Sequence, residues 1–275
     1  SIGSRHAENL MSLGVEVDLL SWRDLGRVSR LEEKIQKRKM DGMVIATSTD
    51  IRIPIIELCV KKNIPFYVEK PIAFNEKELE YIYSLPENVL HNSMVGFMMR
   101  YNPVFRHVID LNLKNIFYFD FEIGHDVRKW RKNWDFSNSY ASKPEGGRVL
   151  LDLCHELDMA MCLIPNLKLI NVTSLGHVDY PGVDLQSSCC FSDSALQGFV
   201  SMNYLSPVLR RQASIRTKEI VLDMNFATND LVIETNDIVE RKNFNFERND
   251  MFVDSLSVFL KLISGRNDLI YKNIP

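Results

Sequence analysis

The stretch Asn63-Ile64-Pro65-Phe66-Tyr67-Val68-Glu69-Lys70-Pro71 sets the interpretation of the whole chain. Its first part is a mostly apolar run of strand length, and the proline after Lys70 must end any ladder of strand hydrogen bonds. Ligands of open α/β sheets bind outside the carboxyl ends of the strands. The stretch therefore predicts a buried parallel strand that ends in an ionisable pair at a ligand-binding edge. A solvated lysine in a turn is the alternative interpretation.

Strands and helices alternate on both sides of this stretch. Strands are expected at residues 15–20, 42–47, 63–68 and 89–99. Helices are expected from near residue 4 to Gly14 and over about 29–39, 54–62, 75–84 and 103–111, with Asn75 as an N-cap. This alternation is typical of βαβ units on a parallel sheet.

The start of the chain has the end of a phosphate-binding loop. A dinucleotide-binding unit needs a strand followed by G-x-G-x-x-G, and only Ser1-Ile2-Gly3 precedes the first expected helix. We therefore expect the natural protein to have a preceding strand that ends in Gly-x-Gly. An ordinary turn before a helix is the alternative.

The second half has a different pattern. Strands are expected at 115–124, 168–176, 187–191, 196–204, 211–217, 219–225 and 230–235, with helices at 147–162 and about 250–264. Consecutive strands with few helices between them indicate a mainly antiparallel sheet that helices cover on one face. The sequence thus predicts an α/β chain with a Rossmann domain over residues 1–111 and an α+β domain over residues 112–275.

Composition narrows the class of protein. The chain has 275 residues, of which 45% are hydrophobic, 33 are basic and 36 are acidic. This balance gives no electrostatic argument for nucleic acid, and the apolar runs are well short of the roughly 20 residues that a bilayer requires. Five cysteines without a C-x-x-C pair are typical of reduced thiols, so we expect a cytoplasmic protein that spans no membrane.

A second polar cluster lies on the helix expected near residue 150. Asp152, His155 and Asp158 are spaced by three residues and so share one helical face, while apolar residues cover most of the circumference. A carboxylate one turn away can orient an imidazole for general acid or base chemistry near neutral pH. A solvated polar stripe is the alternative. Metal ligation is also conceivable at this spacing, but no third ligand cluster supports a metal.

Five motifs in this order resemble the Gfo/Idh/MocA family of NAD(P)-dependent sugar oxidoreductases. They are Ser1-Ile2-Gly3-x-x-His6, Ile45-Ala46-Thr47, Glu69-Lys70-Pro71, Gly96-Phe97-Met98-Met99-Arg100-Tyr101-Asn102-Pro103, and Gly146-Gly147 with Asp152 and His155. The resemblance covers nearly the whole chain. It implies a Rossmann domain followed by a substrate domain whose open sheet often mediates oligomerisation, here as a homodimer or homotetramer.

The resemblance also implies roles for individual residues. His155 would take the hydroxyl proton as hydride leaves the sugar carbon, with Asp152 orienting the imidazole and Lys70 polarising the same oxygen. The cofactor would contact Ser1, Ile2, Gly3, Thr47, Ser48, Glu69 and Arg100. The substrate side would include Tyr101, Asn102, Trp130, Arg131, Trp134 and Arg148. The expected substrate is a sugar, a polyol or a nucleotide-linked sugar.

Three positions depart from the family pattern. Many members have the aspartate four residues before the histidine, where this chain has Leu151. Arg148 replaces the usual third glycine, and it either binds an anionic substrate group or is a solvated surface residue. Ser21-Trp22-Arg23 replaces the acidic residue expected at the adenosine ribose, which favours NADP over NAD because a guanidinium suits a 2′-phosphate.

Two other functions remain open from the sequence. A non-catalytic nucleotide sensor would keep the Rossmann fold, but the presence of both Lys70 and His155 favours an enzyme. A hydrolase or dehydratase that recycles bound nicotinamide is the second alternative, and tightly held cofactor without net turnover of added NAD(P) would identify it.

Overall fold

The computed structural model describes residues 1–129, 135–145 and 147–265. The chain divides into two compact units, Ser1–Met98 with the described residues from Arg248 to Gly265, and Met99–Glu247. The boundary expected at residue 111 is therefore corrected. Helix α10 (Arg248–Ile263), expected in the second domain, belongs to the first because its Leu256 and Phe259 pack in one buried cluster with Leu10 and Tyr67.

The first unit is built on a parallel sheet, as the sequence predicts. Its strands are β1 (Met43–Ile45), β2 (Phe66–Val68) and β3 (Met94–Val95), in the order β1-β2-β3. All three residues of β2 are buried. Ile45 pairs with Val68, and Val68 pairs with Val95, so the carboxyl ends of the strands meet at one edge.

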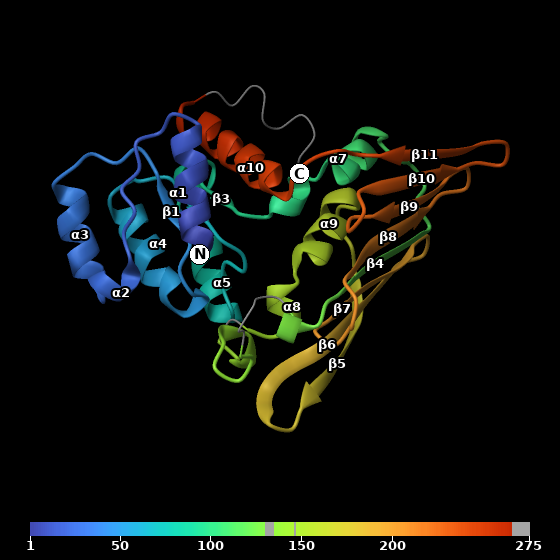
Figure 1. Ribbon diagram of the computed structural model, residues 1–275, viewed down its shortest axis with the longest axis horizontal. Helices are drawn as coiled ribbons and strands as arrows, with labels where there is room; N and C mark the ends of the chain where they lie inside the picture. The colour runs from blue at the N-terminus through green and yellow to red at the C-terminus, as the bar shows by residue number, and fades with distance from the viewer. Residues whose placement is uncertain (130–134, 146, 266–275) are drawn as a thin grey trace. The chain divides into compact units, whose positions relative to one another are not determined.

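Helices surround this sheet. They are α1 (Ile2–Ser12), α2 (Trp22–Leu25), α3 (Val28–Gln36), η1 (Thr49–Ile51), α4 (Arg52–Lys61), α5 (Glu76–Tyr83), α6 (Glu87–Leu90) and α10 (Figure 1). Asn75 caps α5 as expected, because its side chain accepts a hydrogen bond from the Glu78 amide at 2.9 Å. Helix α10 contacts α1, although the two lie at opposite ends of the sequence.

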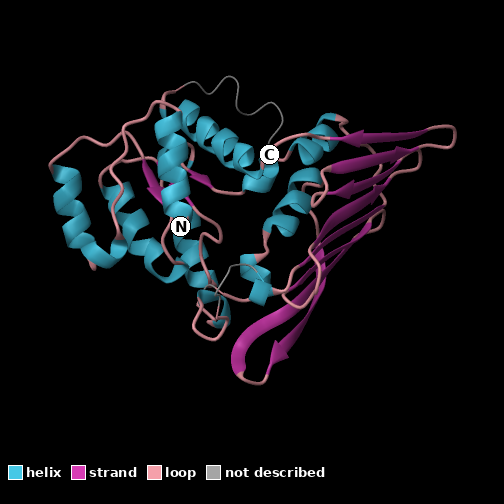
Figure 2. Cartoon of the chain, in the orientation of Figure 1, coloured by secondary structure: helices cyan, strands magenta, loops and turns pink. Residues whose placement is uncertain are grey.

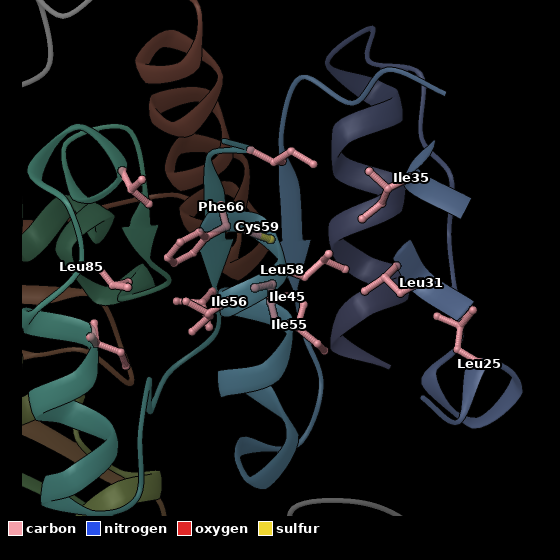
Figure 3. Packing of buried hydrophobic residues seen from close by; sticks show 14 residues of the cluster. Leu25, Leu31, Ile35, Ile45, Ile55, Ile56, Leu58, Cys59, Phe66 and Leu85 are labelled. Atoms are coloured by element: carbon pink, nitrogen blue, oxygen red, sulfur yellow. The ribbon is translucent and has the colours of Figure 1, made fainter. Parts of the chain in front are cut away.

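One apolar cluster holds the sheet against α3 and α4. Figure 3 shows Ile56 and Cys59 of α4 beside Phe66 of β2, with Leu31 and Ile35 of α3 on the other side of α4. Ile56 and Cys59 are completely buried. Because a buried side chain of this kind contributes about 1.5–3 kcal/mol, the cluster fixes the position of β2 and of the residues that follow it.

Two expected strands of this unit differ in the structure. Residues 15–20 form no strand. In the doubly wound order the second strand pairs with the first, and residues 1–14 form a helix and a turn that offer no ladder partner. The strand expected at 89–99 is reduced to β3, because helix α6 takes its first residues and β3 pairs with the three-residue strand β2.

The second unit is a mainly antiparallel sheet, as predicted (Figure 2). Its strands are β4 (Tyr118–Gly124), β5 (Leu169–His177), β6 (Tyr180–Ser192), β7 (Gln197–Asn203), β8 (Arg210–Arg216), β9 (Val221–Asn225), β10 (Asp230–Glu234) and β11 (Val239–Asn243). They follow the order β11-β10-β9-β8-β4-β7-β6-β5, and β4 and β7 run parallel. Strand β11 was missed because Val-Glu-Arg-Lys-Asn has no alternating apolar pattern.

Short helices cover one face of this sheet. They include η2 (Met98–Tyr101), α7 (Pro103–Asp110), η3 (Val127–Lys129), η4 (Tyr140–Ser142), α8 (Val149–Asp152) and α9 (His155–Leu163). Strand β4 shows the two faces, because Phe119 and Phe121 are buried while Asp120 and Glu122 are half-buried. Helix α9 contacts β4 and β7, so the aromatic face of the sheet supports the helix that begins with His155.

Candidate functional site

The carboxyl edge of the parallel sheet brings several predicted residues together. Thr47 and Ser48 follow β1, and Glu69 and Lys70 follow β2. The Glu69 amide donates to the Ile45 carbonyl at 3.0 Å, which joins the two segments beyond the ends of the strands. Lys70 is half-buried at this edge. The segment therefore lies where ligands bind to sheets of this kind.

Arg52, which the sequence did not single out, holds the same edge. It is the first residue of α4 and is 4% exposed. Its guanidinium donates to the Thr47 carbonyl at 2.7 Å and to the carbonyls of Glu69 and Pro71. The planar group thus connects the ends of β1 and β2. An arginine inside an apolar helix pattern was the available signal, because arginine is rarely buried without a partner.

Glu69 contacts helix α1 in this structure. Its Oε1 atom lies 2.6 Å from Nε2 of His6, and both residues are buried. The His6 ring packs edge-on against Tyr67 and Phe252, at centroid distances of 5.2 and 5.8 Å. The family resemblance implies that Glu69 borders the nicotinamide ribose, and the structure gives one of its oxygens a protein partner.

The N-terminus of α1 carries the residues expected at the cofactor pyrophosphate. The Ser1 side chain caps the helix by accepting from the Ser4 amide at 3.2 Å. The first turn has no acidic residue. Free amides and the positive end of a helix dipole suit an anion. At Gly3 an added Cβ would lie 3.6 Å from the Ala46 Cβ, which is ordinary contact, so close packing does not require this glycine.

The predicted adenosine-side residues lie on and before the single turn of α2. Ser21 precedes the turn, and its side chain makes no capping hydrogen bond. Trp22 is half-buried against the apolar cluster of the first unit, whereas Arg23 is exposed. Ser21 also lines a hollow of about 410 Å³.

Three basic residues that the sequence interpretation missed line the same hollow. They are Arg30, Lys34 and Lys37, and Glu33 and Asp24 also reach it. The signal was available, because residues spaced by four and three positions lie on one face of a helix. The lining of the hollow therefore includes the Ser21 hydroxyl and more basic than acidic side chains.

In the second unit the expected helix from 147 to 162 is broken in two. Helix α8 ends at Asp152 and α9 begins at His155, and both residues are 6% exposed. Leu153 leaves helical geometry at the break, with φ −98° and ψ 29°. The assumption of one continuous helical face for Asp152 and His155 is therefore corrected.

Two tyrosines that the sequence interpretation missed bind Asp152. The Tyr204 hydroxyl donates to its carboxylate at 2.9 Å, and the Tyr140 hydroxyl donates at 3.1 Å. Burial raises the pKa of Tyr204 well above its ordinary value, and the Asp152 charge adds to this effect, so Tyr204 keeps its proton and acts as a donor. No local pattern identifies these partners, because a tyrosine at a strand end is typical of packing.

Helix α9 is tied to its surroundings by two arginine–carboxylate pairs. Arg211 of β8 binds Glu156 at 2.6 Å, and Glu156 is completely buried. Arg100 binds Asp158 through both Nη2, at 2.6 Å, and Nε, at 2.9 Å. Burial opposes the Arg100 charge, but Asp158 outweighs that effect and raises the guanidinium pKa. Arg100, predicted to contact the cofactor, thus has a firm protein partner.

The remaining predicted substrate residues have distinct environments. Tyr101 and Asn102 are buried, and the Asn102 side chain caps α7 by accepting from the Val104 amide at 2.9 Å. Arg148 has φ 66° and ψ 145°, a conformation that favours glycine. Trp130, Arg131 and Trp134 lie outside the described residues, as does Gly146.

Gly147 is required by a close approach. A Cβ atom there would lie 2.3 Å from the Tyr140 carbonyl oxygen and 2.6 Å from that of Ala141. The glycine therefore lets the start of α8 pack against the backbone of η4. Among residues 1–129, 135–145 and 147–265, no group of three or more His, Cys, Asp or Glu side chains could hold a metal ion. Within the same ranges, no helix is long and apolar enough to cross a membrane.

Comparison with known proteins identifies the fold. No family model and no curated protein matches the sequence. UDP-N-acetylglucosamine 3-dehydrogenase from Acidithiobacillus ferrooxidans is similar in structure, with a TM-score of 0.75, 14% identity, and coverage of 98% of this chain and 88% of that one. An NAD binding oxidoreductase from Klebsiella pneumoniae is also similar in structure. It has a TM-score of 0.76 and 16% identity, over 98% of this chain and 87% of that one.

A third structure is levoglucosan dehydrogenase in complex with NADH and levoglucosan. It matches with a TM-score of 0.74 and 16% identity, over 96% of this chain and 79% of that one. At such identities the likeness establishes the fold. The chain therefore shares the two-part fold of these solved oxidoreductases, which is the fold that the resemblance of its motifs implied.

Proposed function

We propose that the protein is an oxidoreductase that transfers hydride between a nicotinamide cofactor and a hydroxyl-bearing carbon of a sugar, polyol or nucleotide-linked sugar. One observation carries the proposal: a chain with the fold of sugar dehydrogenases keeps Lys70 at the carboxyl edge of β2 and His155 at the start of α9. The bound nicotinamide would supply the hydride acceptor, and the protein would manage one proton and one orientation.

The proton is assigned to His155 and Lys70. As the carbon–hydrogen bond breaks, the substrate hydroxyl loses its proton to the His155 imidazole, and the Lys70 ammonium polarises the same oxygen. Asp152 orients the imidazole in this scheme. Its own position is held by the Tyr204 and Tyr140 hydroxyls, which support a fixed carboxylate at the end of α8.

The first unit fits a dinucleotide. The amides of Ser1 and Ile2 at the N-terminus of α1 would bind the pyrophosphate, and Thr47 and Ser48 would border the nicotinamide ribose. NADP is favoured over NAD because Ser21 and Arg23 stand where an acidic residue would bind ribose hydroxyls. The basic residues of the hollow beside Ser21 support this preference. Trp22 is assigned to the apolar core, because it packs against the buried cluster of the first unit.

A second copy of the chain is the proposed partner. The face of the large sheet opposite the helices carries Tyr118 and Phe199, whose rings lie 6.3 Å apart, beside half-buried polar residues. We propose a homodimer or homotetramer through this face, which light scattering on the purified protein would measure. A monomer over the whole accessible concentration range would contradict it.

The function is tested with purified protein and both dinucleotides. UDP-N-acetylglucosamine and levoglucosan, with related sugars and polyols, are each incubated with NAD or NADP, and formation of the reduced nicotinamide is followed by absorbance. We expect turnover that depends on the sugar and is faster with NADP. Dinucleotide binding without turnover on any compound would favour the nucleotide sensor. Product formation without net reduction of added cofactor would favour the recycling enzymes.

A further inference from the structure

Lys70 has a main chain that is fixed on both sides. Before it, the Glu69 amide donates to Ile45 and the Glu69 carbonyl accepts from Arg52. After it, the Pro71 carbonyl accepts from the same guanidinium. The direction in which the Lys70 side chain leaves the backbone is therefore determined by its two neighbours.

Arg52 is suited to this task by its shape. Its guanidinium reaches the Thr47, Glu69 and Pro71 carbonyls from one position at the start of α4. A planar group with five donors can bridge several acceptors, whereas a lysine ammonium on a flexible stem cannot reproduce that geometry. Because Arg52 is buried, water does not compete for these hydrogen bonds.

His6 fixes the Glu69 side chain in the same way. The 2.6 Å contact joins two groups that are 1% and 8% exposed. Among the described residues, Nδ1 of His6 is buried and has no hydrogen-bond partner, so the ring makes its hydrogen bond through Nε2, to Glu69. The ring is itself held between Tyr67 and Phe252.

This arrangement reaches the last helix of the unit. Phe252 belongs to α10, and the Tyr67 hydroxyl lies 3.1 Å from Ser255 Oγ on the same helix. Helices α1, α4 and α10 are therefore all joined to the few residues around Lys70. Such a set of buried contacts restricts local motion more than a surface turn would allow.

We propose that His6, Glu69 and Arg52 form a positioning brace that sets the direction of the Lys70 ammonium. The proposal rests on the proposed oxidoreductase function, in which Lys70 polarises the substrate oxygen. In this proposal Glu69 binds His6 and helps to position Lys70, and it does not contact the ribose directly. Fixed placement matters because a misplacement of about 1 Å can cost about 100-fold in rate.

The first test measures Lys70 directly and needs no substrate. The full chain, as wild type, His6→Phe and Arg52→Lys, is labelled with limiting acetic anhydride, and mass spectrometry compares Lys70 with exposed Lys77 of α5. His6→Phe keeps an aromatic ring and removes the hydrogen bond to Glu69. Arg52→Lys keeps the positive charge and removes the planar guanidinium that bridges the three carbonyls. His91→Phe and Arg27→Lys, at exposed positions, are the matched controls.

We expect the Lys70 labelling rate, relative to Lys77, to change by about threefold or more in both brace variants, because amine reactivity follows the local environment. The controls should match wild type. An unchanged Lys70 rate in folded His6→Phe and Arg52→Lys would overturn the brace. If thermal unfolding shows that His6→Phe is not folded, His6→Gln replaces it. Its amide donor is expected to restore the wild-type rate, and a Lys70 rate still altered in folded His6→Gln would overturn the role of the hydrogen bond.

The second test uses a sugar that the wild type oxidises. Arg52→Lys and His6→Phe should lower kcat by about 10- to 100-fold with KM nearly unchanged. Glu69→Ala removes the acceptor of His6 and should lower kcat to a similar extent, with the NADP dissociation constant nearly unchanged. A direct contact of Glu69 with the ribose would instead raise that dissociation constant in Glu69→Ala and leave Lys70 labelling unchanged in His6→Phe. If the wild-type protein oxidises no sugar, the proposed function is wrong. The labelling test of Lys70 still decides whether the brace exists.

Discussion

The two regions that carry the proposed chemistry are held by different kinds of contact. Around Lys70, the fixed groups are mainly main-chain carbonyls and one buried His6–Glu69 pair. Around His155, helix α9 is held by two arginine–carboxylate pairs, and Asp152 is held by tyrosine hydroxyls. The comparison shows that a predicted site residue with a clear sequence signal can still be held by partners that lie far away in the chain.

The largest effect is expected from replacing Lys70 or His155, the two residues proposed to handle the proton. Lys70→Met and His155→Gln should each lower the rate of hydride transfer by about 100-fold or more, because a positioned acid–base group contributes that much. Dinucleotide affinity should change little, since neither residue is assigned to the pyrophosphate or adenosine. Single-turnover absorbance and equilibrium binding measure the two quantities. Lys77→Met serves as the control, and wild-type rates in both site variants would remove the assignment.

The second prediction concerns the region before His155. Gly147→Ala places a Cβ against the carbonyl oxygens of Tyr140 and Ala141, which are main-chain atoms that cannot swing away. We expect a loss of about 3 kcal/mol in the free energy of unfolding, near the upper end for overpacking. Denaturant titration checks this value. Gly176→Ala, where the nearest atom would be 3.6 Å away, should cost far less.

The third prediction tests the ion pairs of α9. Glu156→Gln leaves Arg211 mostly buried without its counter-charge, and breaking a buried pair in this way typically costs about 3 kcal/mol. The exposed pair of Lys61 and Glu32 is the matched comparison, and Lys61→Met should change stability far less, because an exposed ion pair is screened by solvent. Equal small losses in both variants, measured by denaturant unfolding, would show that the Glu156 pair does not hold α9.

Much of the local structure around Lys70 could be predicted from the sequence. Asn63 to Pro71 predicted a buried strand with an ionisable edge, and β2 has that form because three buried residues are soon followed by Pro71, which has no amide to donate. Asn75 predicted the start of α5 correctly, since an N-cap acts through bonds within one turn. Local signals succeed where the physical cause is local.

Contacts across long sequence separations were not predictable in the same way. His6 and Glu69 are 63 residues apart, Arg211 and Glu156 are 55 apart, and Tyr204 and Asp152 are 52 apart. None of these pairs leaves a periodic trace, because each depends on how separate elements pack. The break between α8 and α9 was also missed, since helix periodicity continues through it. Pairing partners likewise decided that residues 15–20 form no strand.

The fourth prediction concerns Arg148, at a position where the family usually has glycine. Its φ of 66° with ψ of 145° costs about 1–3 kcal/mol for a residue with a side chain. Arg148→Gly removes that strain but adds backbone entropy to the unfolded chain, at about 0.5–1 kcal/mol. We expect a net gain of about 1 kcal/mol, seen as a higher melting temperature. If Arg148 also binds an anionic group of the substrate, KM rises in the same variant; an unchanged KM assigns it to the surface.

The smallest expected effect lies on the open face of the large sheet. Burial and then the neighbouring Glu122 charge raise the pKa of Asp120, against the opposing pull of Arg216. A carboxyl whose pKa is raised by folding stabilises the protein while it is protonated, and this stability is lost as pH rises through the folded pKa. Asp120→Asn removes the penalty at neutral pH. For a partly exposed carboxyl we expect a gain of about 0.5 kcal/mol.

The effect of Asp120→Asn on stability should depend on pH. The difference in melting temperature between Asp120→Asn and wild type should be largest near pH 7 and should shrink as the pH falls to where Asp120 binds a proton. Glu234→Gln, on β10 of the same sheet, is the matched control for loss of one negative charge. A gain in Asp120→Asn that is equal at both ends of the range would mean that the amide makes new contacts and that the buried charge carries no cost.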